Sequence, residues 1–357
     1  MESDPALTQT PAPRRFVIGS RASKLAVIQA EIVHAALIKL HPHATFALSY
    51  MTTEGDKNQT QALYLMGGAE KALWTKELEV GLLDGDIDLI VHSLKDVPTT
   101  LPDRCELGAI MEREDPRDCL VVKAGLPYER LEDLPEGSVI GTSSIRRVAQ
   151  LRRAFPKFKF ADVRGNLNTR LAKLDKPDSE YTALILASAG LVRLGYASRV
   201  TCHLGPPTLY YAVGQAALGI EVRSDDLATK ELVQGITHHE TNLVCRAERS
   251  CLKVLEGGCS VPVGMKSDFI ADSSSTHGAG KLKMTGTVTS LDGTSHVECS
   301  EEANISSLAE AEAVGQRVAQ KLVANGAKQI LEDIVAAKQK RIKLDQAAAQ
   351  VADQIES

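Results

Sequence analysis

Features that mark several protein classes are missing from this sequence. It contains no apolar run that approaches the roughly 20 residues needed to span a bilayer, which excludes a membrane-spanning helix. Cysteine is scarce, with seven among 357 residues, and no two cysteines form a Cys-x-x-Cys pair. An odd, thinly spread set argues against a disulfide framework and predicts a reducing compartment.

Metal-site and targeting patterns are missing as well. The histidine pairs His41/His43 and His238/His239 have no partners at zinc spacing, so no metal ion is predicted. The first fifteen residues hold three prolines and two acidic residues, without the apolar segment of a signal peptide. We therefore expect a disordered tail over residues 1–15 and a cytoplasmic protein.

Charge is nearly balanced over the whole chain. The 41 Lys and Arg residues stand against 46 Asp and Glu, which gives a formal net charge of −5. This argues against a protein whose whole surface binds nucleic acid, although local basic patches remain open. At roughly 150 residues per domain, the length predicts two or three domains.

Short apolar strands alternate with amphipathic helices from residue 16 onward. Apolar residues at 25, 28, 32, 36 and 40 share one helical face, and a similar alternation recurs between about 120 and 194. This favours two α/β units, each with a mostly parallel sheet and helices on both faces. After residue 241, helices accompany an alternating strand at 281–290 and a turn signal at Asp292-Gly293, which predicts an α+β unit.

The strongest local charge lies at residues 141–170, which hold eight Lys or Arg residues and one Asp. Thr142–Ser144 lie where a predicted strand ends and a helix begins, a position that favours bound anions. Arg146 and Arg147 follow within the first helical turn, and a guanidinium can bind a carboxylate or phosphate through two hydrogen bonds. The window therefore predicts an anion site.

A solvated basic helix is the alternative interpretation of this window, and it is favoured for Arg152 and Arg153. It is weaker for the residues at the strand end, because ligands of open α/β sheets bind there. Arg21 follows the first predicted strand at the matching place. Arginines of both units facing one cleft would bind a ligand with several carboxylates.

A carboxylate, Asp96, follows the most apolar predicted strand, at its C-terminal end. It could exchange a proton or stabilise a developing cation in the same cleft. A structural Asp paired with Lys95 at a turn is an equally good interpretation, and spacing alone does not decide between them.

Cys259 follows two glycines, Gly257 and Gly258, which leave its thiol little cover. A thiolate there could attack an electrophile or hold a covalent group. A lone cysteine is more often a buried apolar residue, and that interpretation is favoured on this evidence alone.

Five motifs in order resemble the porphobilinogen deaminase family. They are Val-His-Ser-Leu-Lys-Asp-Val-Pro (91–98), Gly-Thr-Ser-Ser-Ile-Arg-Arg (141–147), Arg-Gly-Asn-Leu-Asn-Thr-Arg (164–170), Tyr-Ala-Val-Gly-Gln-Ala-Ala-Leu-Gly (211–219) and Glu-Gly-Gly-Cys-Ser-Val-Pro (256–262). The likeness extends from about residue 16 to about 335. It implies a transferase that adds four porphobilinogen units to a dipyrromethane primer, with loss of ammonia, and releases hydroxymethylbilane by hydrolysis.

The resemblance also implies an architecture. Two lobes resemble type II periplasmic binding proteins, and a smaller α+β C-terminal domain presents the cysteine loop. The implied domains are 16–113 with 213–237, then 114–212, then 238–340, with tails at 1–15 and 341–357. A segment at residues 55–73 resembles the family's mobile loop over the active site.

Roles carry over by motif. Cys259 matches the attachment point of the dipyrromethane through a thioether, and Asp96 matches the catalytic aspartate that attends proton transfer and stabilises the substrate cation. The residues that match cofactor-binding positions are Lys95, Ser93, Thr142, Ser143, Ser144, Arg146, Arg147, Arg170 and Arg193. Those that match substrate-binding positions are Arg21, Ser23, Gln29, Arg164 and Gln215.

Two other functions compete with this one. A non-catalytic protein that binds carboxylate ligands on the same two lobes would need the arginines, but neither Asp96 nor Cys259. Nucleic-acid binding through residues 141–170 is disfavoured, because the patch lacks interleaved aromatic residues for base stacking. We expect porphobilinogen as the small-molecule partner, no nucleic acid or membrane, and a monomer, because no long apolar seam is left over.

Overall fold

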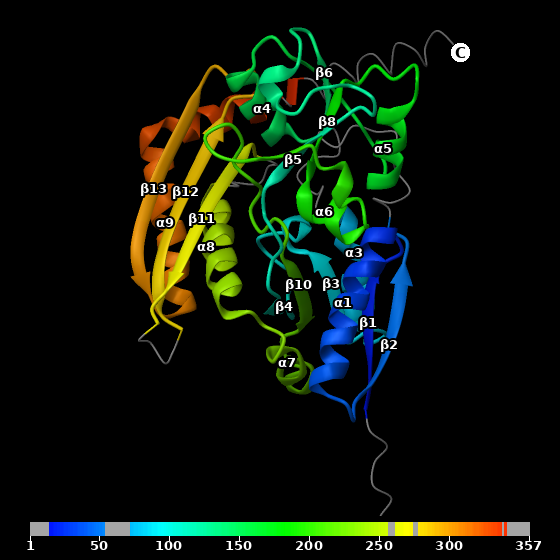
Figure 1. Ribbon diagram of the computed structural model, residues 1–357. Coiled ribbons are helices and arrows are strands. Elements are labelled where there is room, and N and C mark those ends of the chain that lie inside the picture. The colour runs from blue at the N-terminus through cyan, green and yellow to red at the C-terminus, as the bar shows by residue number, and fades with distance from the viewer. Residues whose placement is uncertain (1–13, 54–71, 256–260, 274–277, 338, 341–357) are drawn as a thin grey trace, which may run out of the picture.

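A computed structural model describes residues 14–53, 72–255, 261–273, 278–337 and 339–340. Within this part of the chain, the strands form two five-stranded sheets and one three-stranded sheet. Figure 1 shows three bodies around these sheets, with the first sheet below, the second above it, and the third to one side. The helix α6 of the upper lobe lies against α1 of the lower lobe, in both views.

The first lobe has the strand order β2-β1-β3-β10-β4. Its strands are β1 (Arg15–Arg21), β2 (Thr45–Met51), β3 (Leu89–Ser93), β4 (Cys105–Ile110) and β10 (Leu218–Arg223), and its helices are α1 (Lys24–Leu40), α3 (Ala72–Asp84) and α7 (Leu227–Gln234). The buried face of α1 includes Ala26, Ala30, Val33 and Leu37, as the helical spacing requires. This face packs on the sheet and forms one of the lobe's apolar cores.

The second lobe repeats the arrangement in the order β7-β6-β8-β5-β9. Its strands are β5 (Asp118–Val122), β6 (Val139–Gly141), β7 (Lys159–Ala161), β8 (Ala183–Ala187) and β9 (Cys202–Leu204), and its helices are α4 (Ile145–Ala154), α5 (Leu167–Asp175) and α6 (Ser188–Arg193). Apolar clusters lie on both faces of this sheet. Helices therefore pack on both faces of this sheet, as in other α/β units.

The expectation of mostly parallel sheets is confirmed for the direction of the strands, because one strand of each five-stranded sheet runs against the other four. In the first lobe β1 pairs in parallel with β2 and β3, whereas β10 runs antiparallel to β3 and β4. The second lobe shows the same mixture, because β5 runs antiparallel to β8 and β9. Each antiparallel strand joins its sheet on a crossing between the lobes, which local alternation of strands and helices does not reveal.

The third domain is an antiparallel sheet covered by two helices. Its strands are β11 (Val263–Ala271), β12 (Gly280–Thr289) and β13 (His296–Ile305), and its helices are α8 (His239–Leu255) and α9 (Leu308–Leu322). The predicted hairpin is confirmed, and Gly293 adopts the positive φ of 80° that its turn requires. Gly315 of α9 lies so close to α8 that a Cβ there would be 2.0 Å from the Ala247 carbonyl oxygen.

The helix α8 docks this domain on the first lobe through buried polar side chains. Glu248 accepts hydrogen bonds from Arg113 Nη1 at 3.1 Å and from the Gly214 amide at 2.8 Å. Arg249 donates to the Val97 carbonyl at 3.0 Å and to the Pro98 carbonyl. Because these groups are satisfied only when domain and lobe are in contact, they fix the position of α8.

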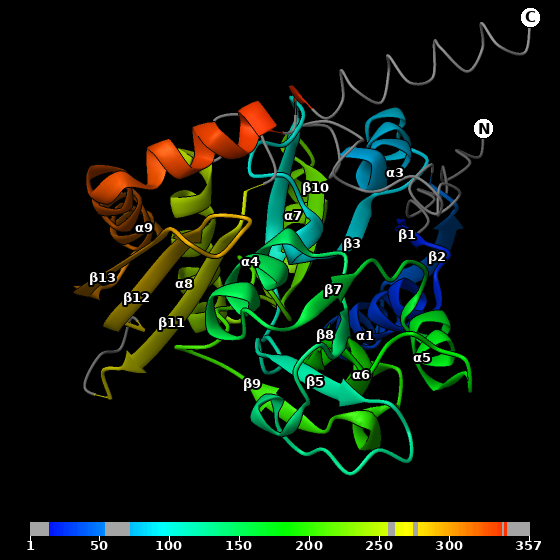
Figure 2. The same cartoon turned by 90° about the horizontal axis from the view of Figure 1, so that it is seen from above.

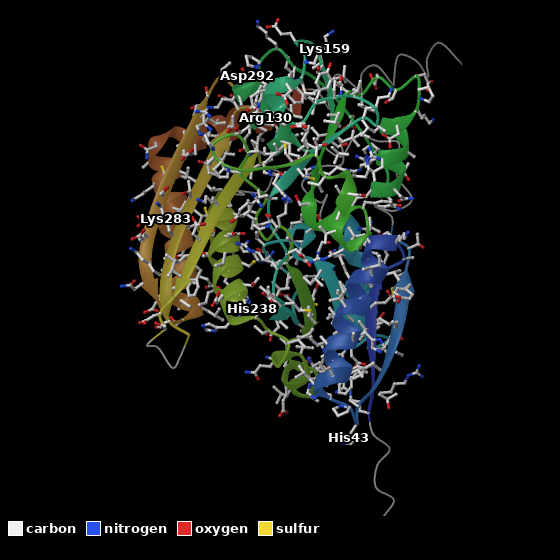
Figure 3. The ribbon with its side chains drawn as sticks, viewed as in Figure 1. His43, Arg130, Lys159, His238, Lys283 and Asp292 are labelled. Atoms are coloured by element: carbon white, nitrogen blue, oxygen red, sulfur yellow. The ribbon has the colours of Figure 1, made fainter. Side chains whose placement is uncertain are left out.

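The third domain also contacts the second lobe. Figure 3 shows Asp292 at the tip of the β12–β13 hairpin, beside α4. Arg152 of α4 donates to the Leu291 carbonyl at 2.8 Å, and the Arg153 backbone lies against Gly293. The predicted class, two α/β lobes with an α+β third domain, is confirmed.

Two other expectations bear on the described residues. No helix among them is long and apolar enough to cross a membrane, and no group of three or more His, Cys, Asp or Glu residues there could hold a metal ion. Figure 3 shows His43 beyond α1 and His238 at the start of α8, on separate parts of the molecule. The tails predicted at 1–15 and 341–357 lie almost entirely outside the described residues, as does most of the segment at 55–73.

Candidate active site

A pocket of about 330 Å³ lies where the two lobes face each other. The first lobe contributes the residues that follow β1 and β3, and the second contributes the start of α5, part of α6 and Arg147 of α4. These segments lie at or follow the C-terminal ends of β1, β3, β6, β7 and β8, where ligands of open α/β sheets bind. The predicted cleft is therefore present, and both lobes line it.

Cationic side chains dominate the walls. The pocket is lined by Arg21, Lys24, Lys95, Arg147, Arg164, Arg170 and Arg193. Within the described part of the chain, one carboxylate, that of Asp96, lies among them. Fixed positive charge inside a low-dielectric concavity concentrates its field on the space between the walls, so the pocket suits a ligand with several negative groups.

Asp96 ends a short 3-10 turn, Leu94–Asp96, that continues directly from β3. The Leu94 amide donates to the Ala217 carbonyl at 3.0 Å, and the Leu94 side chain is completely buried. Beyond the turn, Arg249 of α8 holds the next two carbonyls. A buried anchor on one side and a guanidinium on the other therefore fix the backbone that carries Asp96.

Lys95 belongs to the same turn and lies close to four other charged residues. Burial lowers its pKa, and Arg147 and Arg146 lower it further, whereas Asp96 and Asp118 raise it. The opposing charges partly offset the cost of burying an ammonium group. A bound carboxylate would add a negative charge next to Lys95 and so stabilise its protonated form.

The two arginines at the start of α4 differ in their positions. Arg147 lines the pocket, and its Nη2 donates to the Asp118 carboxylate at 2.7 Å while its Nη1 donates to the Ile185 carbonyl at 2.8 Å. Arg146 is not part of the wall: it pairs with Asp118 at 2.8 Å and donates to the Tyr210 carbonyl. Its predicted contact with a ligand stays a prediction, since Arg146 is buried and is not among the residues that line the pocket.

Arg170 and Arg193 are cations of the second-lobe wall whose charged form is disfavoured by burial. Burial lowers the pKa of Arg170 to about 10, and the nearby Arg147 and Arg164 contribute in the same direction. Burial also lowers the pKa of Arg193, whose Nη2 donates to the Ala216 carbonyl at 2.7 Å. Burial thus disfavours the charged form of both guanidiniums, and a bound anionic ligand would stabilise that form.

The first-lobe wall is polar at its base. Gln29 of α1 donates from Nε2 to the Ser93 hydroxyl at 2.8 Å, which joins the helix to the end of β3. Arg21, the last residue of β1, and Ser23, the N-cap of α1, also line the pocket. The structure therefore brings together these four predicted residues from β1, α1 and β3.

Other predicted site residues lie outside the wall. The Ser143 hydroxyl donates to the Val163 carbonyl at 2.8 Å, and Thr142 Oγ1 accepts from the Ser144 amide at 3.3 Å. Gln215 Nε2 donates to the Pro116 carbonyl at 2.7 Å and to Asp118 at 2.9 Å. Their roles in binding stay predictions. Cys259 lies outside the described residues.

Several lining residues were missed by the sequence argument. They are Lys24, His92, Asn166 and Asn168. The two asparagines and His92 lie inside motifs already quoted, and Lys24 is next to Ser23, so position within a motif was the available signal. Asp118, behind the wall, lies in no such motif.

Comparison with known proteins agrees with this geometry. A family model described as "Porphobilinogen deaminase, dipyromethane cofactor binding domain" matches residues 16–231, and one described as "Porphobilinogen deaminase, C-terminal domain" matches residues 242–324. The first match spans both lobes and every lining residue of the pocket. The second lies within the third domain.

Similar proteins of other organisms carry the same name. Porphobilinogen deaminase of Yarrowia lipolytica is 49% identical over 331 residues, which cover 91% of this chain and 95% of that protein. The protein of Schizosaccharomyces pombe is 46% identical over 90% of this chain and 96% of its own length. Among solved structures, the methionine-binding protein MetQ is 14% identical with a TM-score of 0.39, over 64% of this chain and 91% of that one.

Proposed function

The chain belongs to the porphobilinogen deaminase family, and from this premise we propose how its own residues carry out the reaction. It is a transferase of tetrapyrrole biosynthesis, and its cofactor is dipyrromethane. It joins four porphobilinogen molecules head to tail, with loss of ammonia, and releases hydroxymethylbilane by hydrolysis.

We propose that Asp96 is the catalytic residue. The observation that supports this most directly is that, among the residues the structure describes, Asp96 is the single carboxylate beside seven cationic side chains of the wall. Each porphobilinogen loses ammonia and becomes a cation, and the pyrrole ring carbon that forms the new bond to it must then lose its proton. A fixed carboxylate in this pocket stabilises the charge and accepts the proton.

We propose that the cations of the wall hold the acetate and propionate groups of the pyrroles. The pocket fits such a ligand on one further ground: the buried Arg147 Nε makes no hydrogen bond within the described part of the chain, although its other nitrogens are used. A dipyrromethane would supply carboxylates to these groups and a growing end for the next pyrrole. Arg147, Arg170 and Arg193 would orient it from the second lobe, and Lys95 from the first.

The residues outside the wall take supporting roles in this proposal. Thr142, Ser143 and Ser144 border the N-terminus of α4, where backbone amides favour an anion. Arg146 and Gln215 act through Asp118, which both of them contact. Ser93 and Gln29 orient each other next to Arg21, Ser23 and Arg164, which would receive the incoming porphobilinogen.

Cys259 is proposed as the attachment point, on the strength of its motif. The intact mass of the purified protein tests this. We expect an excess equal to two linked pyrroles in the natural sequence, none in Cys259→Ala, and the full excess in the control Cys299→Ala, another cysteine of the third domain. An excess that persists in Cys259→Ala would contradict the assignment.

Turnover tests the role of Asp96. Asp96→Asn keeps the shape and a hydrogen-bonding oxygen but removes the charge and the basic site, so we expect a loss of roughly a hundredfold or more. The control Asp103→Asn changes an exposed carboxylate a short distance along the chain and should leave the rate unchanged. Near-normal turnover of Asp96→Asn with the primer attached would refute the assignment, and no turnover by any form would favour a carboxylate-binding protein.

We further propose that the protein acts as a monomer in the cytoplasm. The described cysteines are all free, which suits a reducing compartment. Sedimentation equilibrium and microscopy of a tagged chain test the two statements separately.

A further inference from the structure

A buried carboxylate outside the pocket connects several parts of the site. Asp118, the first residue of β5, is completely buried, and it does not line the cavity. It forms ion pairs with Arg147 Nη2 at 2.7 Å and with Arg146 Nη1 at 2.8 Å. A third donor, Gln215 Nε2, reaches it at 2.9 Å.

The three partners of Asp118 come from separate segments. Arg146 and Arg147 lie on the first turn of α4, and Gln215 lies on the chain as it returns to the first lobe before β10. Arg147 is the one that faces the ligand space. With one nitrogen on Asp118 and another on the Ile185 carbonyl, its guanidinium is held in a single plane.

Asp118 is also a counter-charge for a cluster of cations. The charged groups around Lys95 are Asp96 on its own turn, Asp118 from β5, and Arg146 and Arg147 from α4. Three positive groups therefore stand against two negative ones. If Asp96 is engaged with the reacting pyrrole, Asp118 is the remaining negative charge of the cluster.

We propose that Asp118 is a positioning residue for the reaction, which fixes Arg147 at the pocket wall and supplies the counter-charge of the cluster formed by Lys95, Arg146 and Arg147. This inference rests on the proposed function, in which these cations hold the ligand's carboxylates. A purely structural role would stabilise the second lobe without changing how the pocket binds its ligand or how binding depends on pH.

The test uses Asp118→Asn in the primer-loaded enzyme, with KM and kcat for porphobilinogen measured across pH. Loss of the charge lets Arg147 move, and we expect KM to rise by about tenfold to a hundredfold. Because Asp118 raises the pKa of Lys95, its removal lets the lysine lose its proton at lower pH. The alkaline limb of kcat/KM should therefore move to lower pH, by roughly one unit.

Two further variants make the result specific. Asp118→Glu keeps the charge but shifts the carboxylate by one methylene, so KM should rise while the alkaline limb stays in place. Asp175→Asn is the matched control, because Asp175 binds Arg199 through two hydrogen bonds, at 2.6 and 3.0 Å, in the same lobe and away from the pocket. Its KM and pH profile should equal those of the natural sequence.

An unchanged KM and an unchanged alkaline limb in folded Asp118→Asn would overturn the inference. If that variant does not fold, Asp118→Glu decides, and an unchanged KM in it would overturn the inference too. Arg147→Gln separates this failure from failure of the proposed function. A large loss of activity in Arg147→Gln with a normal Asp118 variant rejects only the positioning role, whereas normal activity in Arg147→Gln rejects the ligand-binding role of the wall.

Discussion

The buried pair of Glu248 and Arg113 should be among the largest single contributions to the attachment of the third domain. The Glu248 side chain is completely buried, and that of Arg113 is 12% exposed. We predict the effect of Glu248→Gln, which keeps the shape of the side chain and an oxygen that can still accept from the Gly214 amide. What it removes is the negative charge next to Arg113.

The magnitude follows from what is left behind. Breaking a buried ion pair by removing one partner leaves an uncompensated charge and typically costs about 3–5 kcal/mol. With a shift of roughly 2–4 °C per kcal/mol for domains of this size, the midpoint of thermal unfolding should fall by at least about 6 °C. Activity at low temperature should persist, because neither residue lines the pocket.

Thermal unfolding of the primer-loaded protein is the assay, with two comparisons. In the double variant Glu248→Gln with Arg113→Met the stranded cation is gone, so the double variant should be more stable than Glu248→Gln alone. Glu301→Gln removes a surface pair with Lys321 in the same domain and should cost less than about 1 kcal/mol. If the midpoint of thermal unfolding of Glu248→Gln falls by 2 °C or less, the loss of stability is roughly 1 kcal/mol at most, and the reasoning is refuted.

Three other predictions concern buried groups. Burial raises the pKa of Glu79, so the contribution of its protonated form to stability is present at acid pH and is lost as pH rises. Glu79→Gln should therefore melt at the same temperature as the natural protein near pH 5 and at a higher temperature near pH 8.5. Equal melting temperatures of the two proteins at both pH values would contradict this. Gly315→Ala should cost about 1–3 kcal/mol in urea unfolding because of the Ala247 carbonyl, whereas a gain would show that the helices separate easily. Burial lowers the pKa of Arg170 to about 10, so Arg170→Met removes an unfavourably buried charge and should raise the melting temperature of the primer-free Cys259→Ala protein at pH 7. In the loaded enzyme the same substitution should weaken porphobilinogen binding, and an unchanged KM would contradict that expectation.

Local patterns in the sequence predicted most helices and strands of the lobes, because apolar spacing reports which face of an element is buried. They also located the pocket, since ligands of α/β sheets bind at the carboxyl ends of the strands, here β1 and β3 in the first lobe and β6 in the second. The place of β10 in the first sheet was not predictable in this way. Its partners Leu89–Ser93 lie far back in the chain, and their pairing leaves no local signal.

Asp118 shows the same limit at the level of a single side chain. Its hydrogen-bond partners Arg147 and Gln215 are 29 and 97 positions away, and the surrounding sequence looks like the start of an ordinary strand. Arg146 was expected at the ligand on the evidence of its charge. Arg146 is buried and pairs with Asp118, a partner that only the assembled structure reveals.

The course of the chain through the sheets has a consequence for the order in which the protein can be made. All five strands of the second sheet lie between residues 118 and 204, so a ribosome delivers them as one uninterrupted stretch. In the first sheet, β3 and β4 are both bonded to β10, which ends at residue 223, and so the earlier strands must wait until the whole second lobe has been synthesised. During translation the N-terminal lobe therefore carries an open strand edge that exposes it to mispairing and to chaperones, and the second lobe is the first to complete its fold.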